Sequence, residues 1–110
     1  MDNMNNHEAY ICGWVTGKLE SATGMRCNIS QADAYPFSTM GYMLGRAYSA
    51  RKVSRELHEE IGAAMVNFDS EHAPSGAEKP LPVNQRVYWC FGHQAGSTGK
   101  PYNPDYGKNK

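Results

Sequence analysis

The chain has 110 residues, with 11 Lys or Arg and 11 Asp or Glu, so its formal net charge at neutral pH is zero. This length suits one domain with one core, and a neutral chain has no overall field to draw it onto nucleic acid or an anionic membrane. No apolar run approaches the roughly 20 residues of a membrane span. The opening MDNMNNHEAY lacks the basic and apolar regions of a signal peptide. We therefore expect a cytoplasmic protein with no membrane partner.

The first predicted element is a helix over residues 7–23. Apolar side chains recur along it at helical spacing: Ile11, Val15, Leu19 and Ala22. Asn6 is expected to cap its start and Gly24 to end it. Gly13 and Gly17 each weaken a helix by about 1 kcal/mol relative to alanine, so their presence indicates that another backbone approaches there. Two strands, at AYICGWV and MRCNIS, are the alternative.

A connector over residues 25–35 separates this element from a second predicted helix. Pro36 disfavours helical geometry at Tyr35, so the helix is expected to begin after the proline, with Ser38 as its cap, and to run to about Ala50. Its apolar stripe is rich in methionine: Met40, Met43, Leu44 and Ala47. Such a stripe is typical of a core-facing helix.

Residues 54–69 carry the clearest helical pattern, with Ser54 as the expected cap. One face is apolar: Leu57, Ile61, Ala64, Met65 and Phe68. Beside it, Glu56, Glu59 and Glu60 share an arc of about 100 degrees. The same spacing suits a metal-binding cluster or a solvated helix face, so periodicity alone does not decide between them.

The last third of the chain has mixed signals. Residues 70–83 are expected to form a loop because they contain several Pro, Gly and Ala residues. The apolar segment NQRVYWCFGHQ suits a strand or a short docked helix. The sequence therefore predicts an all-α fold, a small bundle of three main helices plus this segment, in a domain over residues 1–94. An irregular tail over residues 95–110 is expected to have little to bury.

Three cysteines, Cys12, Cys27 and Cys90, are an odd number at wide spacing, which does not suit a disulfide framework. Cys90 and His93 form a C-x-x-H pair. Cys12 and Cys27 would complete a Cys3His zinc set. The alternative is that the cysteines are small apolar side chains in a core, and we expect no cofactor.

One local stretch resembles the Nudix box, G-x5-E-x7-R-E-U-x-E-E-x-G-U, where U is aliphatic. The matching positions are Gly41, Arg55, Glu56, Leu57, Glu59, Glu60 and Gly62. The resemblance implies a Mg2+-dependent hydrolase of nucleoside diphosphate derivatives, with Glu56, Glu59 and Glu60 as metal ligands. The first glutamate of the box falls on Ala47, however, and the loop of the box falls on a predicted helix. Only weak strand signals are present for the mixed sheet of that family.

A second resemblance covers most of the chain, through three segments in order: AYICGWVTGKLES, ELHEEIGAAM and LPVNQRVYWCFGHQ. The matching positions are Ala9, Tyr10, Gly13, Leu19 and Glu20 in the first, Leu57, Ile61, Gly62 and Met65 in the second, and Gln85, Tyr88, Gly92, His93 and Gln94 in the third. This order is similar to the C-terminal region of the large subunit of type I-C CRISPR Cascade, which is also made separately as a small subunit. The closing glycine adjoins the His-Gln pair here rather than preceding it by a few residues.

The second resemblance implies a helical interaction module, not an enzyme, that docks on a CRISPR effector complex and contacts the displaced single-stranded DNA. Such contact needs cations that follow a phosphate backbone. The candidates are Arg46, Arg51, Lys52 and Arg55, around the turn between the second and third predicted helices. The alternative is a solvated turn whose cations balance the glutamates that follow. Because the chain is neutral, a mimic that occupies the small-subunit position and inhibits the complex, as an anti-CRISPR protein does, is a further interpretation.

Overall fold

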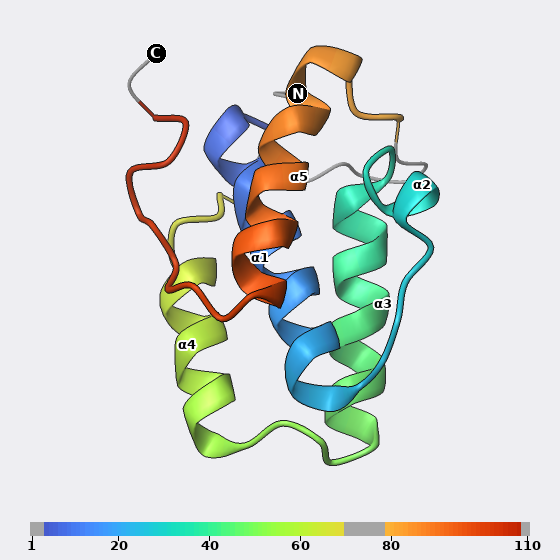
Figure 1. The fold of residues 1–110 in the computed structure, drawn as a ribbon, viewed down its shortest axis with the longest axis vertical. Helices are drawn as coiled ribbons and strands as arrows, with labels where there is room; N and C mark the ends of the chain where they lie inside the picture. The colour runs from blue at the N-terminus through green and yellow to red at the C-terminus, as the bar shows by residue number, and fades with distance from the viewer. Residues whose placement is uncertain (1–3, 70–78, 109–110) are drawn as a thin grey trace.

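The structure, a computed structural model, describes residues 4–69 and 79–108. Within these ranges it contains no strand and five helices (Figure 1): α1 Asn6–Thr23, α2 Ile29–Ala32, α3 Pro36–Ser49, α4 Arg55–Met65 and α5 Val83–Ser97. The predicted all-α fold is confirmed, and the segment NQRVYWCFGHQ lies in a helix rather than a strand. No helix in these ranges could cross a membrane, since none is both long and apolar enough.

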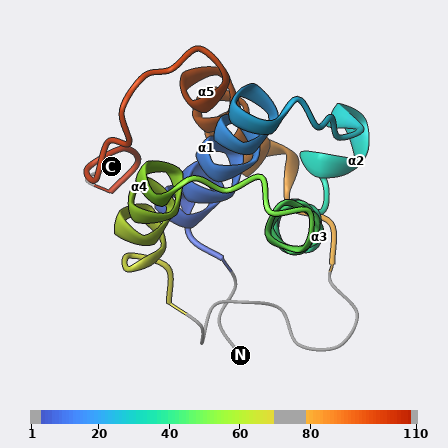
Figure 2. The same ribbon diagram turned by 90° about the horizontal axis from the view of Figure 1, so that it is seen from below.

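The central helix is α1, which packs against α5, α3 and α4 on different sides (Figure 2). Residues 7–17 are therefore buried around the whole circumference of the helix rather than along one stripe. The side chains of Ile11, Trp14 and Val15 lie in the core with those of Met40, from α3, and Trp89, from α5. Complete burial explains why this segment has no polar face in the sequence.

The start of α1 is fixed by a capping box one residue earlier than predicted. The side chain of Asn5, not Asn6, accepts a hydrogen bond from the backbone N–H of Glu8 at 2.8 Å. In return, the Glu8 carboxylate accepts one from the backbone N–H of Asn5 at 2.9 Å. The helix ends as predicted at Gly24, whose φ of 79° is the left-handed conformation that glycine adopts without strain.

The caps of α3 and α4 follow different rules. Pro36 is the first residue of α3, where its missing N–H would have no helical partner anyway. Tyr35 is the N-cap residue and makes no side-chain cap, so the predicted capping role of Ser38 is wrong. Ser54 caps α4 as predicted, through a 3.1 Å hydrogen bond from the N–H of Leu57.

α4 ends at Met65 rather than at residue 69. The chain then turns, and Phe68 stacks on Phe37 of α3 with ring centroids 5.7 Å apart. Most of the loop predicted over residues 70–83 lies outside the described residues, and α5 already begins at Val83. The predicted connector at residues 25–35 contains one unpredicted helical turn, α2.

α1 and α5 meet through glycine on both sides. A Cβ placed on Gly13 would lie 2.8 Å from the backbone nitrogen of His93, and one on Gly96 would lie 2.8 Å from that of Lys18. Gly17 and Gly92 are equally close to the opposing backbone. Each helix thus contributes a G-x-x-x-G pair to a glycine seam, defined as Gly13, Gly17, Gly92 and Gly96. The prediction that Gly13 and Gly17 admit another backbone is confirmed.

The chain after α5 returns to cover α1, contrary to the expectation that it has little to bury. Tyr106 stacks on Tyr10 with ring centroids 4.7 Å apart, and Tyr102 packs on Tyr10 and Trp14. The indole Nε1 of Trp14 donates to the carbonyl of Lys100 at 3.0 Å. In addition, α5 continues to Ser97, so residues 95–97 of the predicted tail are helical.

Candidate functional site

The four predicted nucleic-acid-binding cations are exposed on and around the α3–α4 connection, at one end of the molecule (Figure 1). The guanidinium of Arg46 donates to the hydroxyl of Tyr42 at 3.1 Å and lies 5.7 Å from its ring centre. Arg55 forms an exposed ion pair with Glu59 at 3.6 Å. Arg51 and Lys52 lie in the connection itself. An exposed tyrosine such as Tyr42 beside cations is a combination found at single-stranded nucleic-acid surfaces.

The backbone of this connection has an arginine at a position where glycine is usual. Arg51 has a φ of 57°, the left-handed conformation in which glycine is usual. Its N–H donates to the carbonyl of Tyr48 at 3.0 Å, and the N–H of Lys52 donates to that of Ala47 at 3.0 Å. These two bonds form a Schellman motif at the end of α3. The motif holds Arg51 and Lys52 outward.

The three candidate metal-binding glutamates lie exposed on α4 and do not form a ligand group. Glu60 pairs with Lys18 of α1 at 3.4 Å, and Glu59 pairs with Arg55. Within the described part of the chain, the side chains close enough to share one ion are a different set, Glu20, Cys27 and His93. The position that the Nudix box reserves for a loop, from Gly41 onward, is helical through the end of α3.

The predicted Cys3His set is also not assembled. Cys12 is buried in the core and Cys90 is exposed, whereas Cys27 lies at an intermediate depth. Only Cys27 and His93 of that set belong to the group of adjacent ligand atoms. Glu20, a matching position of the second resemblance that was not among the predicted zinc ligands, stands in the group instead of the other two cysteines.

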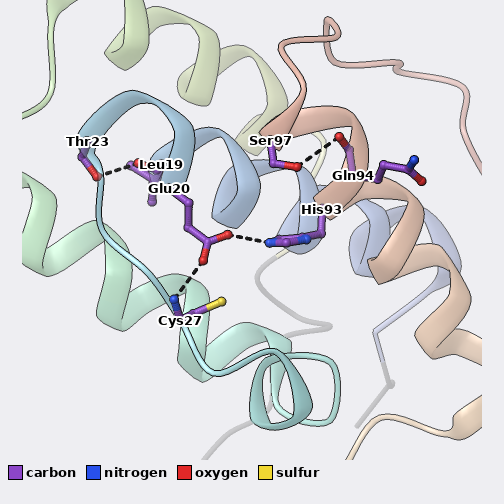
Figure 3. A network of polar contacts seen from close by, with 7 residues as sticks. All are labelled: Leu19, Glu20, Thr23, Cys27, His93, Gln94 and Ser97. Carbon is purple, nitrogen blue, oxygen red and sulfur yellow. Dashed lines mark hydrogen bonds and ion pairs between the residues drawn. The ribbon is translucent and has the colours of Figure 1, made fainter.

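This polar cluster of Glu20, Cys27 and His93 joins three separate segments of the chain (Figure 3). Glu20 lies near the end of α1, Cys27 in the connector to α2, and His93 on α5. Nε2 of His93 is 2.5 Å from one oxygen of Glu20, and the backbone N–H of Cys27 donates to the other at 2.9 Å. Both side chains of the Glu20–His93 pair are less than a fifth exposed. The His93 ring also stacks on Trp89 at 4.8 Å.

The cluster controls the protonation of its members. Burial alone would raise the pKa of Glu20, but hydrogen bonds from Cys27 and His93 outweigh it and hold that pKa below its usual value. Burial, and then the adjacent Glu20 carboxylate, raise the pKa of the Cys27 thiol to about 12. A thiol so strongly protonated is a poor nucleophile. The raised pKa therefore argues against covalent catalysis by Cys27, and a metal ion could bind its sulfur only by displacing the thiol proton.

A groove of about 560 Å³ borders the cluster on the side of α2 and α3. Its lining includes Arg26, Cys27, Asn28, Gln31, Tyr35, Ser38, Thr39, Tyr42 and Met43. Cys27 belongs to both the polar cluster and the lining of the groove, so the groove borders the cluster at this residue. No local sequence pattern predicts this arrangement, since its residues are far apart along the chain and converge only when α1 pairs with α5.

No protein-family model matches the chain, and neither does any curated protein or any solved structure. The fold and its surfaces define a class only: a small all-α bundle with a glycine seam, an exposed cationic connection and one polar cluster beside a groove.

Proposed function

We propose that the chain is a helical interaction module that docks on a CRISPR effector complex in the position of its small subunit. The observation that carries the proposal is that matching positions from the first and last resembling segments contact each other. Gly13 and Gly92 both belong to the glycine seam, and Glu20 bonds His93. Positions that recur together in a family and touch in a fold are those expected to preserve one packing arrangement.

The middle resembling segment supports the same proposal. Leu57 and Ile61 are each 4% exposed and face the core, while the glutamates of α4 face solvent. This arrangement is that of a structural helix in a bundle, and the three glutamates of α4 do not form the metal-ligand group that the hydrolase alternative needs. An interaction module without catalytic residues is therefore the better proposal.

A test of docking uses a type I-C complex purified without its small subunit. The chain is expected to co-elute with that complex on size exclusion and to be displaced by an excess of the complex's own small subunit. Co-elution that the native small subunit does not displace would place the chain elsewhere on the complex, and no co-elution would overturn the proposal.

The cationic connection suggests how a docked module would meet displaced DNA. Reversing Arg51 and Lys52 to glutamate is expected to weaken single-stranded DNA binding by the complex. If both cations contact phosphates, the log–log salt slope should fall by about 1.4. The matched control reverses two exposed cations elsewhere, Lys100→Glu with Lys108→Glu, and should retain affinity.

The same complex distinguishes a subunit from an inhibitory mimic. A subunit should restore DNA targeting to the depleted complex, and that rescue should fail in the Arg51→Glu/Lys52→Glu variant. A mimic should instead block targeting when it is added with the native small subunit, and the charge reversal should leave that block intact. Both the rescue and the inhibition experiments are needed, because a chain with zero net charge suits either role.

A further inference from the structure

We propose that Glu20, Cys27 and His93 bind a zinc-type divalent ion through three protein ligands, with a further coordination position facing the groove. This inference does not depend on docking to any complex. One ligand atom of each residue lies within 4.8 Å of the others. Ligands of a tetrahedral zinc ion are about 3.5 Å apart, given metal–ligand distances of about 2.0–2.3 Å. Side-chain adjustments of about 1 Å therefore suffice to close the site.

The donor types specify the kind of ion. A thiolate and an imidazole are soft or borderline ligands that favour zinc or cobalt, whereas magnesium and calcium take mainly oxygen ligands. Glu20 adds a carboxylate, which leaves a bound zinc ion close to neutral together with the Cys27 thiolate. Three ligands from the chain leave one position for water or for a donor from another molecule.

Contacts with the surrounding helices hold the three ligand residues in place. The glycine seam fixes the distance between α1, which carries Glu20, and α5, which carries His93. The His93 ring is stacked on Trp89, and the backbone of Cys27 is tied to Glu20. The groove borders the site at Cys27, and we place the entry of the ion on this side. A site assembled from three rigidly held segments requires little ordering on binding.

In the metal-free cluster, the ligand atoms are bonded to protons instead of to a metal ion. The Cys27 thiol and the Glu20–His93 pair are joined by hydrogen bonds, and the thiol is strongly protonated. Binding replaces the S–H bond of Cys27 with a metal–sulfur bond and releases one proton to solvent. The Glu20–His93 hydrogen bond is replaced by one metal–oxygen and one metal–nitrogen bond. The proton that Nε2 shares with Glu20 moves through solvent to Nδ1, so that a neutral imidazole binds through Nε2.

The test titrates untagged, metal-free protein with Co2+ and with Zn2+. The expected result is one ion per chain, a thiolate-to-cobalt charge-transfer band, visible bands typical of tetrahedral cobalt, and an increased melting temperature. Cys27→Ser is the decisive variant because it retains side-chain size and the backbone bond to Glu20. It should abolish the charge-transfer band and weaken Zn2+ binding by at least about 100-fold.

The matched control is Cys90→Ser, which removes the exposed cysteine from the same helix as His93 and should bind the ion as the parent chain does. The circular dichroism spectrum of each metal-free variant verifies that it is folded before titration. A parent chain without a charge-transfer band would overturn the site. So would a band that persists in Cys27→Ser or disappears in Cys90→Ser.

Discussion

Gly13 of α1 lies so close to the carbonyl of Trp89 in α5 that a Cβ at position 13 would overlap the oxygen. Gly13→Ala is therefore expected to force the two helices apart and to lower the free energy of unfolding by about 2–3 kcal/mol, the upper range for overpacking. Urea denaturation followed by circular dichroism measures this change.

The matched control for the glycine seam is Gly41→Ala or Gly62→Ala. Both glycines lie inside helices, and a Cβ on either would meet nothing within 4 Å. These variants should leave the protein unchanged or stabilise it by up to about 1 kcal/mol, because alanine has the higher helix propensity. A Gly13→Ala protein as stable as the parent would show that α1 and α5 do not approach backbone to backbone.

α4 offers a second test, of core packing against surface charge. Ile61 is 4% exposed, so Ile61→Ala should lower the free energy of unfolding by about 2–4 kcal/mol through lost burial and a cavity. Glu59→Gln removes only an exposed ion pair with Arg55 and should change stability by less than about 0.5 kcal/mol. Chemical denaturation of the two variants in parallel provides the measurement. A large effect of Glu59→Gln would mean that the carboxylate has a role beyond a solvated helix face.

The left-handed conformation of Arg51 predicts a stabilising substitution within the cationic connection. Arg51→Gly relieves the clash between Cβ and the following carbonyl, and the larger unfolded-state entropy of glycine offsets part of the gain. The expected net gain is about 0.5–1 kcal/mol, measured by thermal unfolding. Arg51→Val is the opposing control, since a β-branched residue is strained at positive φ and should destabilise the protein. If valine were tolerated as well as glycine, Arg51 would not be held in this conformation.

His7 connects α1 to the chain after α5 and predicts a dependence of stability on pH. Its Nδ1 donates to the carbonyl of Tyr106 at 2.6 Å, and its Nε2 lies 2.6 Å from the hydroxyl of Tyr102, which also accepts from Asn67. In the neutral ring, Nε2 accepts the proton of that hydroxyl. Burial lowers the pKa of His7 below 6.5. Below pH 6.5 the unfolded chain therefore binds the proton first, and the free energy of unfolding should fall as the pH is lowered from 7 towards 5.

Denaturation at several pH values measures the His7 effect. The variant His7→Gln, which cannot take up a proton, should be less stable at pH 7 and should show a flatter dependence between pH 5 and 7. A parent protein whose stability is constant or increases as the pH falls through this interval would contradict the buried, neutral state of His7.

Local rules predicted most of the helices because their signals lie within a few residues. Ser54 and Gly24 act as expected, since a cap depends on neighbouring backbone groups. The predictions that were wrong concern features that depend on contacts between distant parts of the chain. Asn5 and Asn6 are chemically equal candidates, and only the reciprocal bond with Glu8 selects Asn5. The chain after α5 has few apolar residues, yet Tyr102 and Tyr106 pack against α1. No local sequence pattern predicts this contact.

The polar cluster could not be predicted from the sequence for a related reason. Glu20 and His93 are 73 positions apart, and no spacing rule connects residues at that separation. The zinc hypothesis combined Cys27 and His93, which the fold brings together, with Cys12 and Cys90, which lie apart from them, because residue type was the only guide. The pairing of Gly13 and Gly17 with Gly92 and Gly96 positions the two helices and so selects which side chains meet.

The glycine seam also bears on how the protein is synthesised. Its two halves belong to the first and last helices, so a nascent chain that has been translated only through α4 has no partner for the exposed glycines of α1. Closure of the core must wait until α5 leaves the ribosome. Until then the side of α1 that carries Gly13 and Gly17 lacks its final cover, and this incomplete core is the species most exposed to misassembly.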